Sequence, residues 1–266
     1  MTGLRIALVY PELLGTYGDG GNALVAAERA RARGYDVEVV AVPAGESVPD
    51  DCDLYLLGGG EDEPQVLAAE GLRSDGALLR AVERGAVCLA VCAGLQIVGV
   101  DYTGPDGVQH PGLGLLPLRT QRAWGPGTPP RAVGDLAVTP SPGSGLVGTL
   151  YGYENHGGRT RPVEGATGEP LGYVPAGLGD GERTGVGNGT EDRAEGWITK
   201  VGDGLVVATY LHGPVLAQNP ELADLLLARA AGVGALAPFE LPETEQLRGA
   251  RRRQLGLTEA ATRVGS

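Results

Sequence analysis

Cys92 lies in a sequence context that suits a nucleophile. In the segment 90–96 (AVCAGLQ), an apolar run changes at the cysteine into residues with helical spacing. A bend at this point exposes the sulfur and directs the first N–H groups of the helix at it, which stabilises a thiolate. The small residues at 90, 93 and 94 leave room for a tight turn. The alternative is an inert core cysteine, because free cysteine is among the most buried residue types.

A cysteine nucleophile needs a base that later protonates the leaving group, and the chain has three histidines. His212 follows an apolar run and precedes Gly-Pro, so we expect it at the end of a strand. His156 lies in a polar, turn-like segment and could line the same site, whereas His110 precedes a proline and is typical of a surface loop. Alone, His212 would be a structural histidine; paired with Cys92, it is the predicted base.

Developing negative charge on a tetrahedral intermediate needs donors that are already in position. The backbone N–H of Ala93, directly after the cysteine, is one candidate. The three glycines at 58–60, which end another apolar run, offer a second, because glycine lets the main chain approach a substrate closely. Taken alone, such a triple glycine is usually only a turn.

The elements that must position these residues alternate between strands and helices. Apolar runs predict strands at 4–10, 37–42, 53–57, 86–91, 196–201 and 205–210, and helical spacing or helix signals predict helices ending near 33, at 63–84, 93–98 and 220–231. Strands that are apolar on both faces and separated by helices predict an α/β fold, with a mostly parallel central sheet and helices on both faces. Ligands of such folds bind beyond the carboxyl ends of the strands, where the glycines at 58–60 and Cys92 are expected.

The domain organisation is predicted to be simple. The segment 103–144 is rich in proline and glycine with short β-like pieces such as 132–138, and 147–153 is a further apolar piece. No repeat and no clear linker divides the chain. We therefore predict one domain over 1–240 and a helical C-terminal tail over 241–266. The arginines of this tail form either a docking helix or a solvated face.

Composition excludes several classes of protein. The chain has 266 residues, of which 42% are hydrophobic and 20% charged, so it is expected to fold rather than remain disordered. A net charge of -12 argues against nucleic acid as a partner. No apolar run is long enough for membrane insertion, and we expect a cytoplasmic protein. Three cysteines without a C-x-x-C pair favour neither a disulfide framework nor a metal site.

Together these motifs resemble a known family. The segments 92–96 (CAGLQ), 58–60 (GGG) and 210–214 (YLHGP) resemble a class I (triad) glutamine amidotransferase domain of the CobB/CobQ-like branch, which is shared with cobyric acid synthase. Two further segments, 17–22 (YGDGGN) and 154–160 (ENHGGRT), are similar to the glutaminase subunits of lipid II isoglutaminyl synthases within that branch. The resemblance covers about residues 4–230.

The resemblance implies a role for each candidate residue. Cys92 would attack the side-chain amide of L-glutamine, and His212 would deprotonate the thiol and protonate the departing ammonia. Arg131 falls where the family places an arginine for the substrate's α-carboxylate, with Arg122 as the fallback and a surface arginine without a role as the alternative. Gln96 and Gly59 would help to cradle the substrate, with Ala93 supplying its N–H.

The chain departs from the family pattern at two positions. The elbow has Ala90 where glycine is usual, and Pro214 stands where many members place a glutamate two residues after the histidine. The orienting acid of a triad is therefore missing from this segment. We hypothesise that a partner subunit supplies this acid.

The resemblance also implies a partner. A MurT-like Mur ligase would form a heterodimer with this chain, use ATP, and amidate the D-glutamate of lipid II to D-isoglutamine. No G-x-x-x-x-G-K-[ST] loop is present, so no cofactor is expected in this subunit. Two alternatives remain: the glutaminase of a cobyrinate or cobyric acid amidase, and a catalytically silent scaffold that only binds a ligase.

Overall fold

The structure is a computed structural model, and its central element is a six-stranded sheet. The structure describes residues 3–122, 131–175, 187–190 and 192–257. The strands lie in the order β13-β14-β4-β3-β1-β2, and all neighbours are parallel except β13 and β14. Their bounds are β1 Gly3–Val9, β2 Asp36–Val42, β3 Leu54–Leu57, β4 Val87–Val91, β13 Trp197–Val201 and β14 Gly204–Thr209. The predicted mostly parallel sheet is confirmed.

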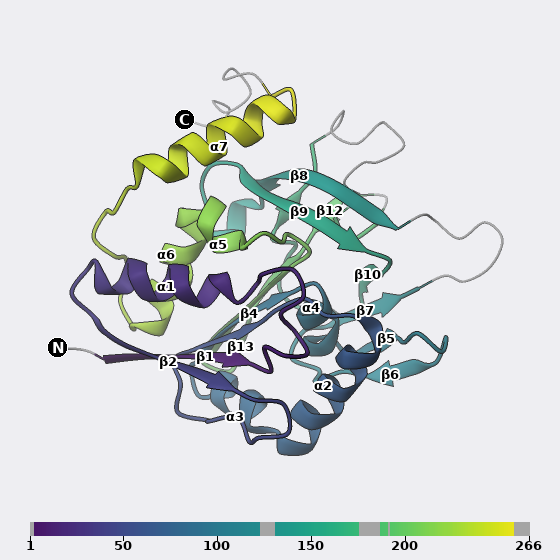
Figure 1. The fold of residues 1–266 in the computed structure, drawn as a ribbon. Coiled ribbons are helices and arrows are strands. Elements are labelled where there is room, and N and C mark those ends of the chain that lie inside the picture. The colour runs from purple at the N-terminus through teal and green to yellow at the C-terminus, as the bar shows by residue number, and fades with distance from the viewer. Residues whose placement is uncertain (1–2, 123–130, 176–186, 191, 258–266) are drawn as a thin grey trace.

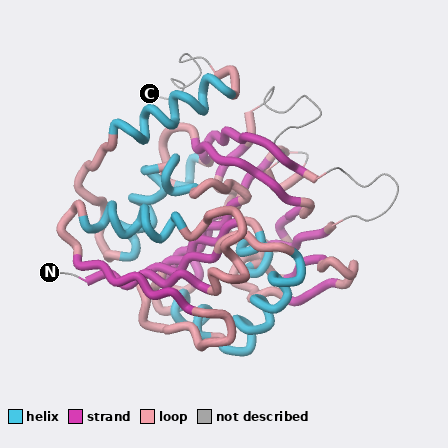
Figure 2. The backbone as a smooth tube through the Cα atoms, viewed as in Figure 1, coloured by secondary structure: helices cyan, strands magenta, loops and turns pink. Residues whose placement is uncertain are grey.

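Helices cover both faces of this sheet (Figure 1). Helices α1 (Gly21–Arg31) and α6 (Pro220–Ala230) pack together on one face, and α2 (Asp62–Asp75) and α3 (Ala77–Glu83) lie on the other. Figure 2 shows the strands running between these two groups of helices. Because both faces are covered, every residue of β3 and β4 is buried.

The helix predicted over 63–84 is two helices, and this prediction was wrong in that respect. Gly76 ends α2 and precedes α3 with φ +64°, a left-handed conformation that glycine adopts without steric cost. The apolar spacing continues across the break, because residues of both helices face the same core. The break was therefore invisible to the periodicity.

Two smaller sheets extend the fold at one end. One contains β5 (Asp101–Thr103), β6 (Gln109–Pro111), β7 (Leu118–Gln121) and β10 (Arg159–Pro162); the other contains β8 (Ala132–Pro140), β9 (Leu150–His156), β11 (Gly172–Tyr173) and β12 (Ala194–Glu195). A short 3-10 turn, η1 (Pro142–Ser144), joins β8 to β9. The pair β8–β9 places the segment after β9 beside Arg131.

The C-terminal helix α7 (Pro242–Gln254) is anchored to the rest of the chain. Arg248 is 6% exposed, donates to Glu221 Oε1 at 2.7 Å and lies over the Tyr151 ring. Arg251 pairs with Asp135 on β8. The expectation of a wholly solvated arginine face is thus wrong for these two arginines, since their partners lie on distant segments. Residues 258–266 of the predicted tail are outside the described part, and the boundary at 240 stays a prediction.

This anchoring predicts a stability effect. Arg248→Ala removes charge-assisted hydrogen bonds to Glu221 and one to the Thr149 carbonyl. We expect the free energy of unfolding to fall by about 1–3 kcal/mol in urea titrations. Arg253→Ala, at an exposed position of the same helix, is the control and should change it by less than about 0.5 kcal/mol. Equal effects of the two substitutions would contradict the anchoring.

Candidate active site

Cys92 occupies a strained turn between β4 and α4 (Ala93–Val98). Its backbone has φ +53° and ψ -102°, a conformation that a residue with a side chain rarely adopts. The turn is held by a bond from Cys92 N–H to the Thr209 carbonyl at 2.8 Å and one from Gly94 N–H to the Gly58 carbonyl at 3.2 Å. A side chain at position 94 would stand 2.9 Å from Leu57 Cβ. The local geometry is that of a nucleophile elbow, and Ala90 in the preceding strand fits it.

His212 lies just beyond β14, the strand that neighbours β4. Its backbone exchanges hydrogen bonds with Tyr153 on β9, which fix the ring's position. Burial lowers the pKa of His212, but hydrogen bonding to Asp19 and interaction with Cys92 outweigh burial and raise it to about 9. Nε2 is buried and makes no fully formed hydrogen bond within the described segments. The structure therefore brings Cys92 and His212 together, with Nε2 left for the proton of the thiol.

Asp19 is the orienting acid, and the hypothesis that the partner supplies it is wrong. The carboxylate oxygen Oδ2 of Asp19 lies 3.0 Å from His212 Nδ1, and the residue is only 2% exposed. It stands in the loop between β1 and α1, within the 17–22 segment. Pro214, at the usual glutamate position, packs against the first turn of α1 instead, where a side chain at Gly21 would meet it at 2.3 Å.

Sequence reasoning missed Asp19 because 193 positions separate it from His212. One signal was available: a loop that leads from the end of a parallel strand to the next helix lies at the carboxyl edge of the sheet, and the glycine-rich part of this loop contains an aspartate. Since Cys92 and His212 were already expected at that edge, Asp19 was the acid to consider.

Gly59 holds the acid in place, and its expected contact with the substrate stays a prediction. Its N–H donates to Asp19 Oδ2 at 2.8 Å, so the backbone of Gly59 positions the acid. A Cβ at this position would stand 2.5 Å from His212 Cε1. Glycine is thus required here by the close approach of the imidazole. The neighbouring Gly60 lines the cleft that contains Cys92.

The remaining predicted residues surround this cleft. We define the active-site cleft by the residues that contribute most to its chemistry: Gly60, Cys92, Gln96, Arg122, Arg131 and His156. Ala93 is the first residue of α4, so its N–H has no acceptor within the helix and suits an oxyanion. The Gln96 amide donates to the Tyr210 hydroxyl at 3.3 Å.

The two candidate arginines differ in their partners. Arg122 forms an ion pair with Asp62 at 2.5 Å, which neutralises its charge locally. Arg131 donates from Nε to Asn155 Oδ1 at 2.5 Å and from Nη2 to the Asn155 carbonyl at 3.0 Å. Both Asn155 acceptors are neutral, so Arg131 keeps a full positive charge for an anionic group. The geometry thus favours Arg131 over Arg122 as the site for a carboxylate.

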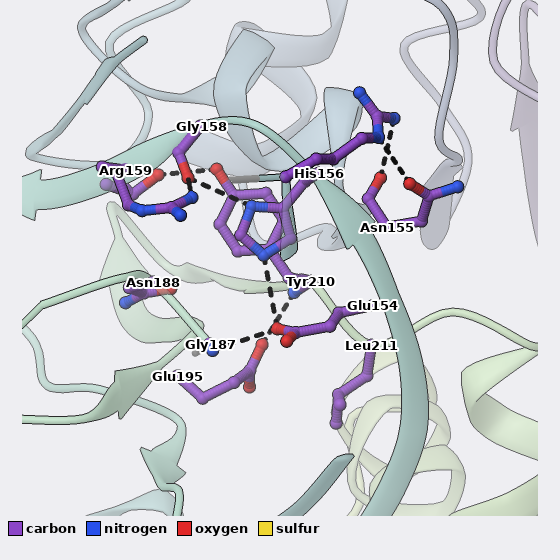
Figure 3. A network of polar contacts seen from close by, with 12 residues as sticks. Glu154, Asn155, His156, Gly158, Arg159, Gly187, Asn188, Glu195, Tyr210 and Leu211 are labelled. Atoms are coloured by element: carbon purple, nitrogen blue, oxygen red, sulfur yellow. Dashed lines mark hydrogen bonds and ion pairs between the residues drawn. The ribbon is translucent and has the colours of Figure 1, made fainter. Parts of the chain in front are cut away.

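His156 belongs to a separate buried network (Figure 3). Its Nε2 lies 3.3 Å from Glu154 Oε2, and its ring stacks on Tyr210 with centroids 3.7 Å apart. It lines the cleft but is tied to Glu154, whereas His110 pairs at the surface with Asp106 at 3.2 Å. Of the three histidines, His212 alone has the geometry of a base for Cys92.

The described residues contain no group of three or more His, Cys, Asp or Glu side chains arranged to hold a metal ion. None of their helices combines the length and the apolar character needed to cross a bilayer.

The Asp19 contact predicts a change in the titration of His212. Asp19→Asn removes the carboxylate that favours the imidazolium, so the pKa of His212 should fall from about 9 toward the ordinary histidine value of about 6.5. A proton NMR titration of the ring measures this. Glu12→Gln, in the same β1–α1 connection, removes a carboxylate that binds the Ala44 N–H and should leave the titration unchanged.

The sign of the linked stability follows from the raised pKa. The imidazolium stabilises the fold fully below about pH 6.5, and this contribution is lost as the pH rises through about 9. An Asp19→Asn protein whose His212 still titrates near 9 would contradict the assignment of the acid.

Comparison with known proteins identifies the family. The CobB/CobQ-like glutamine amidotransferase domain matches residues 5–220. The Staphylococcus aureus (strain N315) protein named lipid II isoglutaminyl synthase (glutamine-hydrolyzing) subunit GatD is 36% identical over 87% of this chain and 86% of its own length. The protein of the same name from Streptococcus pneumoniae (strain ATCC BAA-255 / R6) is 30% identical, covering 92% of this chain and 86% of its own.

A solved structure supports the fold. The Trypanosoma brucei CTPS glutaminase domain with bound acivicin aligns with a TM-score of 0.53 at 12% identity, over 91% of this chain and 98% of that chain. At this identity the likeness concerns the fold alone, and it agrees with the predicted amidotransferase-like architecture. The family match over most of the chain confirms the predicted class of enzyme: the chain belongs to the CobB/CobQ-like glutamine amidotransferase family.

Proposed function

We propose that the chain hydrolyses L-glutamine to glutamate and ammonia through a thioester on Cys92. The observation that carries this proposal is the strained elbow at Cys92, next to an imidazole whose other nitrogen is held 3.0 Å from the buried Asp19. This is the arrangement of nucleophile, base and orienting acid that acyl transfer requires. The name of the staphylococcal relative, which includes glutamine hydrolysis, supports the choice of substrate.

The first half of the reaction forms the thioester. His212 Nε2 takes the thiol proton, and Cys92 Sγ attacks the carboxamide carbon of glutamine. The N–H of Ala93 faces the resulting oxyanion. The imidazolium then gives its proton to the amide nitrogen, the C–N bond breaks, and ammonia leaves. Arg131 holds the α-carboxylate, and Gln96 borders the side chain of the substrate.

The second half regenerates the thiol. With ammonia gone, His212 accepts a proton from water, and the hydroxide attacks the thioester carbonyl. The C–S bond breaks, glutamate departs, and the thiolate recovers its proton from the imidazolium. Asp19 keeps Nδ1 protonated throughout, so Nε2 remains the nitrogen that exchanges protons with the thiol, the amide and water.

The proposed acceptor of the ammonia is supported by the names of two relatives. We propose that this chain forms a heterodimer in the cytoplasm with a MurT-like Mur ligase, which uses ATP to activate the D-glutamate of lipid II. The ammonia then gives D-isoglutamine. Two relatives named as subunits of lipid II isoglutaminyl synthase, each covered over 86% of its length, support this acceptor. The family's CobB/CobQ-like description favours a cobyrinate or cobyric acid amidase as the second candidate.

The test uses the complete complex. The chain is co-purified with its cognate ligase and supplied with ATP, lipid II and either glutamine or ammonium. We expect amidation from both nitrogen sources with the native chain. With Cys92→Ala, glutamine-dependent amidation should fall by at least about a thousandfold while ammonium still supports the reaction. Cys88→Ala, which alters the buried cysteine inside β4, is the control and should retain glutamine use.

Three outcomes would overturn parts of the proposal. A Cys92→Ala complex that still consumes glutamine would exclude the thioester. Glutamine hydrolysis without amidation of lipid II, but with amidation of a cobyrinate, would exclude the cell-wall acceptor. Activity of the ligase with the chain but without glutamine hydrolysis would identify a silent scaffold.

A further inference from the structure

A chain of hydrogen-bonded side chains runs behind the active-site cleft. Gln65 Nε2 donates to Gln96 Oε1 at 2.9 Å, and Gln96 Nε2 donates to the Tyr210 hydroxyl at 3.3 Å. That hydroxyl lies 2.7 Å from Thr160 Oγ1, which lies 2.8 Å from Thr120 Oγ1. The five residues come from α2, α4, the end of β14, β10 and β7. Four of them are buried, and Gln96 lies at the wall of the cleft.

The amide bonds of this chain have a defined direction of donation. Gln65 donates to the Gln96 oxygen and Gln96 donates to the Tyr210 oxygen, whereas in the two hydroxyl pairs, Tyr210–Thr160 and Thr160–Thr120, either oxygen can be the donor. Burial raises the pKa of Tyr210 to about 12, so the hydroxyl keeps its proton. The Gln96 amide is thereby fixed, with its oxygen toward Gln65 and its nitrogen toward Tyr210. A flip of the Gln96 amide alone would place its nitrogen against the Gln65 nitrogen and break that bond.

A second set of contacts holds Tyr210 in place (Figure 3). The His156 ring stacks on the Tyr210 ring at 3.7 Å with an interplanar angle of 15°. The Tyr210 N–H donates to Glu195 Oε1 at 2.7 Å. The tyrosine is therefore fixed at its ring, its backbone and its hydroxyl.

The buried histidine is itself fixed on both sides. His156 Nδ1 lies 3.1 Å from the Gly158 carbonyl and Nε2 lies 3.3 Å from Glu154 Oε2, which also accepts the Gly187 N–H at 3.0 Å. Burial lowers the pKa of the His156 imidazole, against the hydrogen bonds that favour its charged form. The contacts on both sides keep the ring from rotating and so keep its stack on Tyr210.

We propose that Tyr210 is a positioning residue for glutamine hydrolysis, whose hydroxyl holds the Gln96 amide in one orientation at the wall of the active-site cleft. Through this contact Gln96 presents a fixed donor and acceptor pattern to bound glutamine. The inference rests on the proposed glutaminase function. Tyr210 itself lies behind the wall, where the Gly158 backbone covers its hydroxyl: a Cβ at Gly158 would stand 3.0 Å from it.

The experiment replaces Tyr210 by phenylalanine, which keeps the ring and its stack and removes only the hydroxyl. With the full complex, we expect the KM for glutamine to rise about tenfold, the effect of losing one orienting hydrogen bond, and kcat to change by less than about threefold. Tyr55→Phe is the matched control. It removes a buried hydroxyl that donates to the Pro49 carbonyl and accepts from the Cys52 N–H. Both partners precede β3, at the end of the strand that is remote from the active site, so the KM should stay unchanged.

A double-mutant cycle tests the route through Gln96. In a Gln96→Ala background, Tyr210→Phe should raise the KM by less than about twofold, because the amide it orients is gone. A tenfold rise in both backgrounds, or no rise in the native background, would overturn the proposal. If Tyr210→Phe does not fold, Thr160→Val removes the hydrogen-bond partner of the same hydroxyl and should raise the KM in the native background only.

A failure of the proposed glutaminase function would give other results than a failure of the positioning role of Tyr210. In that case the native complex would not hydrolyse glutamine, or Cys92→Ala would retain the activity. The positioning role fails only if the native complex requires Cys92 and yet Tyr210→Phe leaves its KM unchanged.

Discussion

The buried contact between Asp19 and His212 is the interaction on which the site depends. One carboxylate oxygen of Asp19 binds both the imidazole and the N–H of Gly59, so it joins the loops that follow β1, β3 and β14. A buried charge is costly unless it is paired and hydrogen-bonded, and here Oδ2 meets both conditions, while Oδ1 is buried without a hydrogen-bond partner among the described residues. The same contact that makes the loops converge also raises the pKa of the imidazole beside Cys92.

The sheet explains why these loops can meet. Strands β1, β3, β4 and β14 are parallel and adjacent in the order β14-β4-β3-β1, so their carboxyl ends share one edge. A short loop after each of these strands is therefore enough to place a side chain at that edge. The strain at Cys92 is supported by bonds to the two flanking strand ends, at Thr209 and Gly58. Backbone strain of this kind persists only where the surroundings over-determine it.

Most of the central fold was predictable from sequence, and the exceptions have physical reasons. Apolar runs on both faces identified the strands, because burial in a parallel sheet leaves no polar alternation. The break at Gly76 was missed because both helices face one core. Asp19 was missed because its partner is distant in sequence, and the hypothesis of a partner-supplied acid filled that gap wrongly. The anchoring of Arg248 was equally hidden, since Glu221 lies on a different helix.

The candidate site was predictable in its chemistry and less so in its division of roles. Cys92 and His212 followed from strand ends, whereas the contact of the Gly59 N–H with Asp19 did not follow from the sequence. The network behind the cleft could not be inferred from motifs, because its members come from five separate segments. Its hydrogen bonds depend on packing that only the tertiary structure supplies.

The central claim is that the chain itself contains the complete triad of Cys92, His212 and Asp19. The most direct measurement is the rate at which iodoacetamide alkylates Cys92 in the isolated chain from pH 5.5 to 10, followed by peptide mass spectrometry. The account predicts that Cys92 of the isolated chain is alkylated at neutral pH about as fast as in the complex with the ligase, because the His212 imidazolium, whose pKa is about 9, already lies beside the sulfur. Alkylation that becomes fast at neutral pH only when the ligase is added would contradict it.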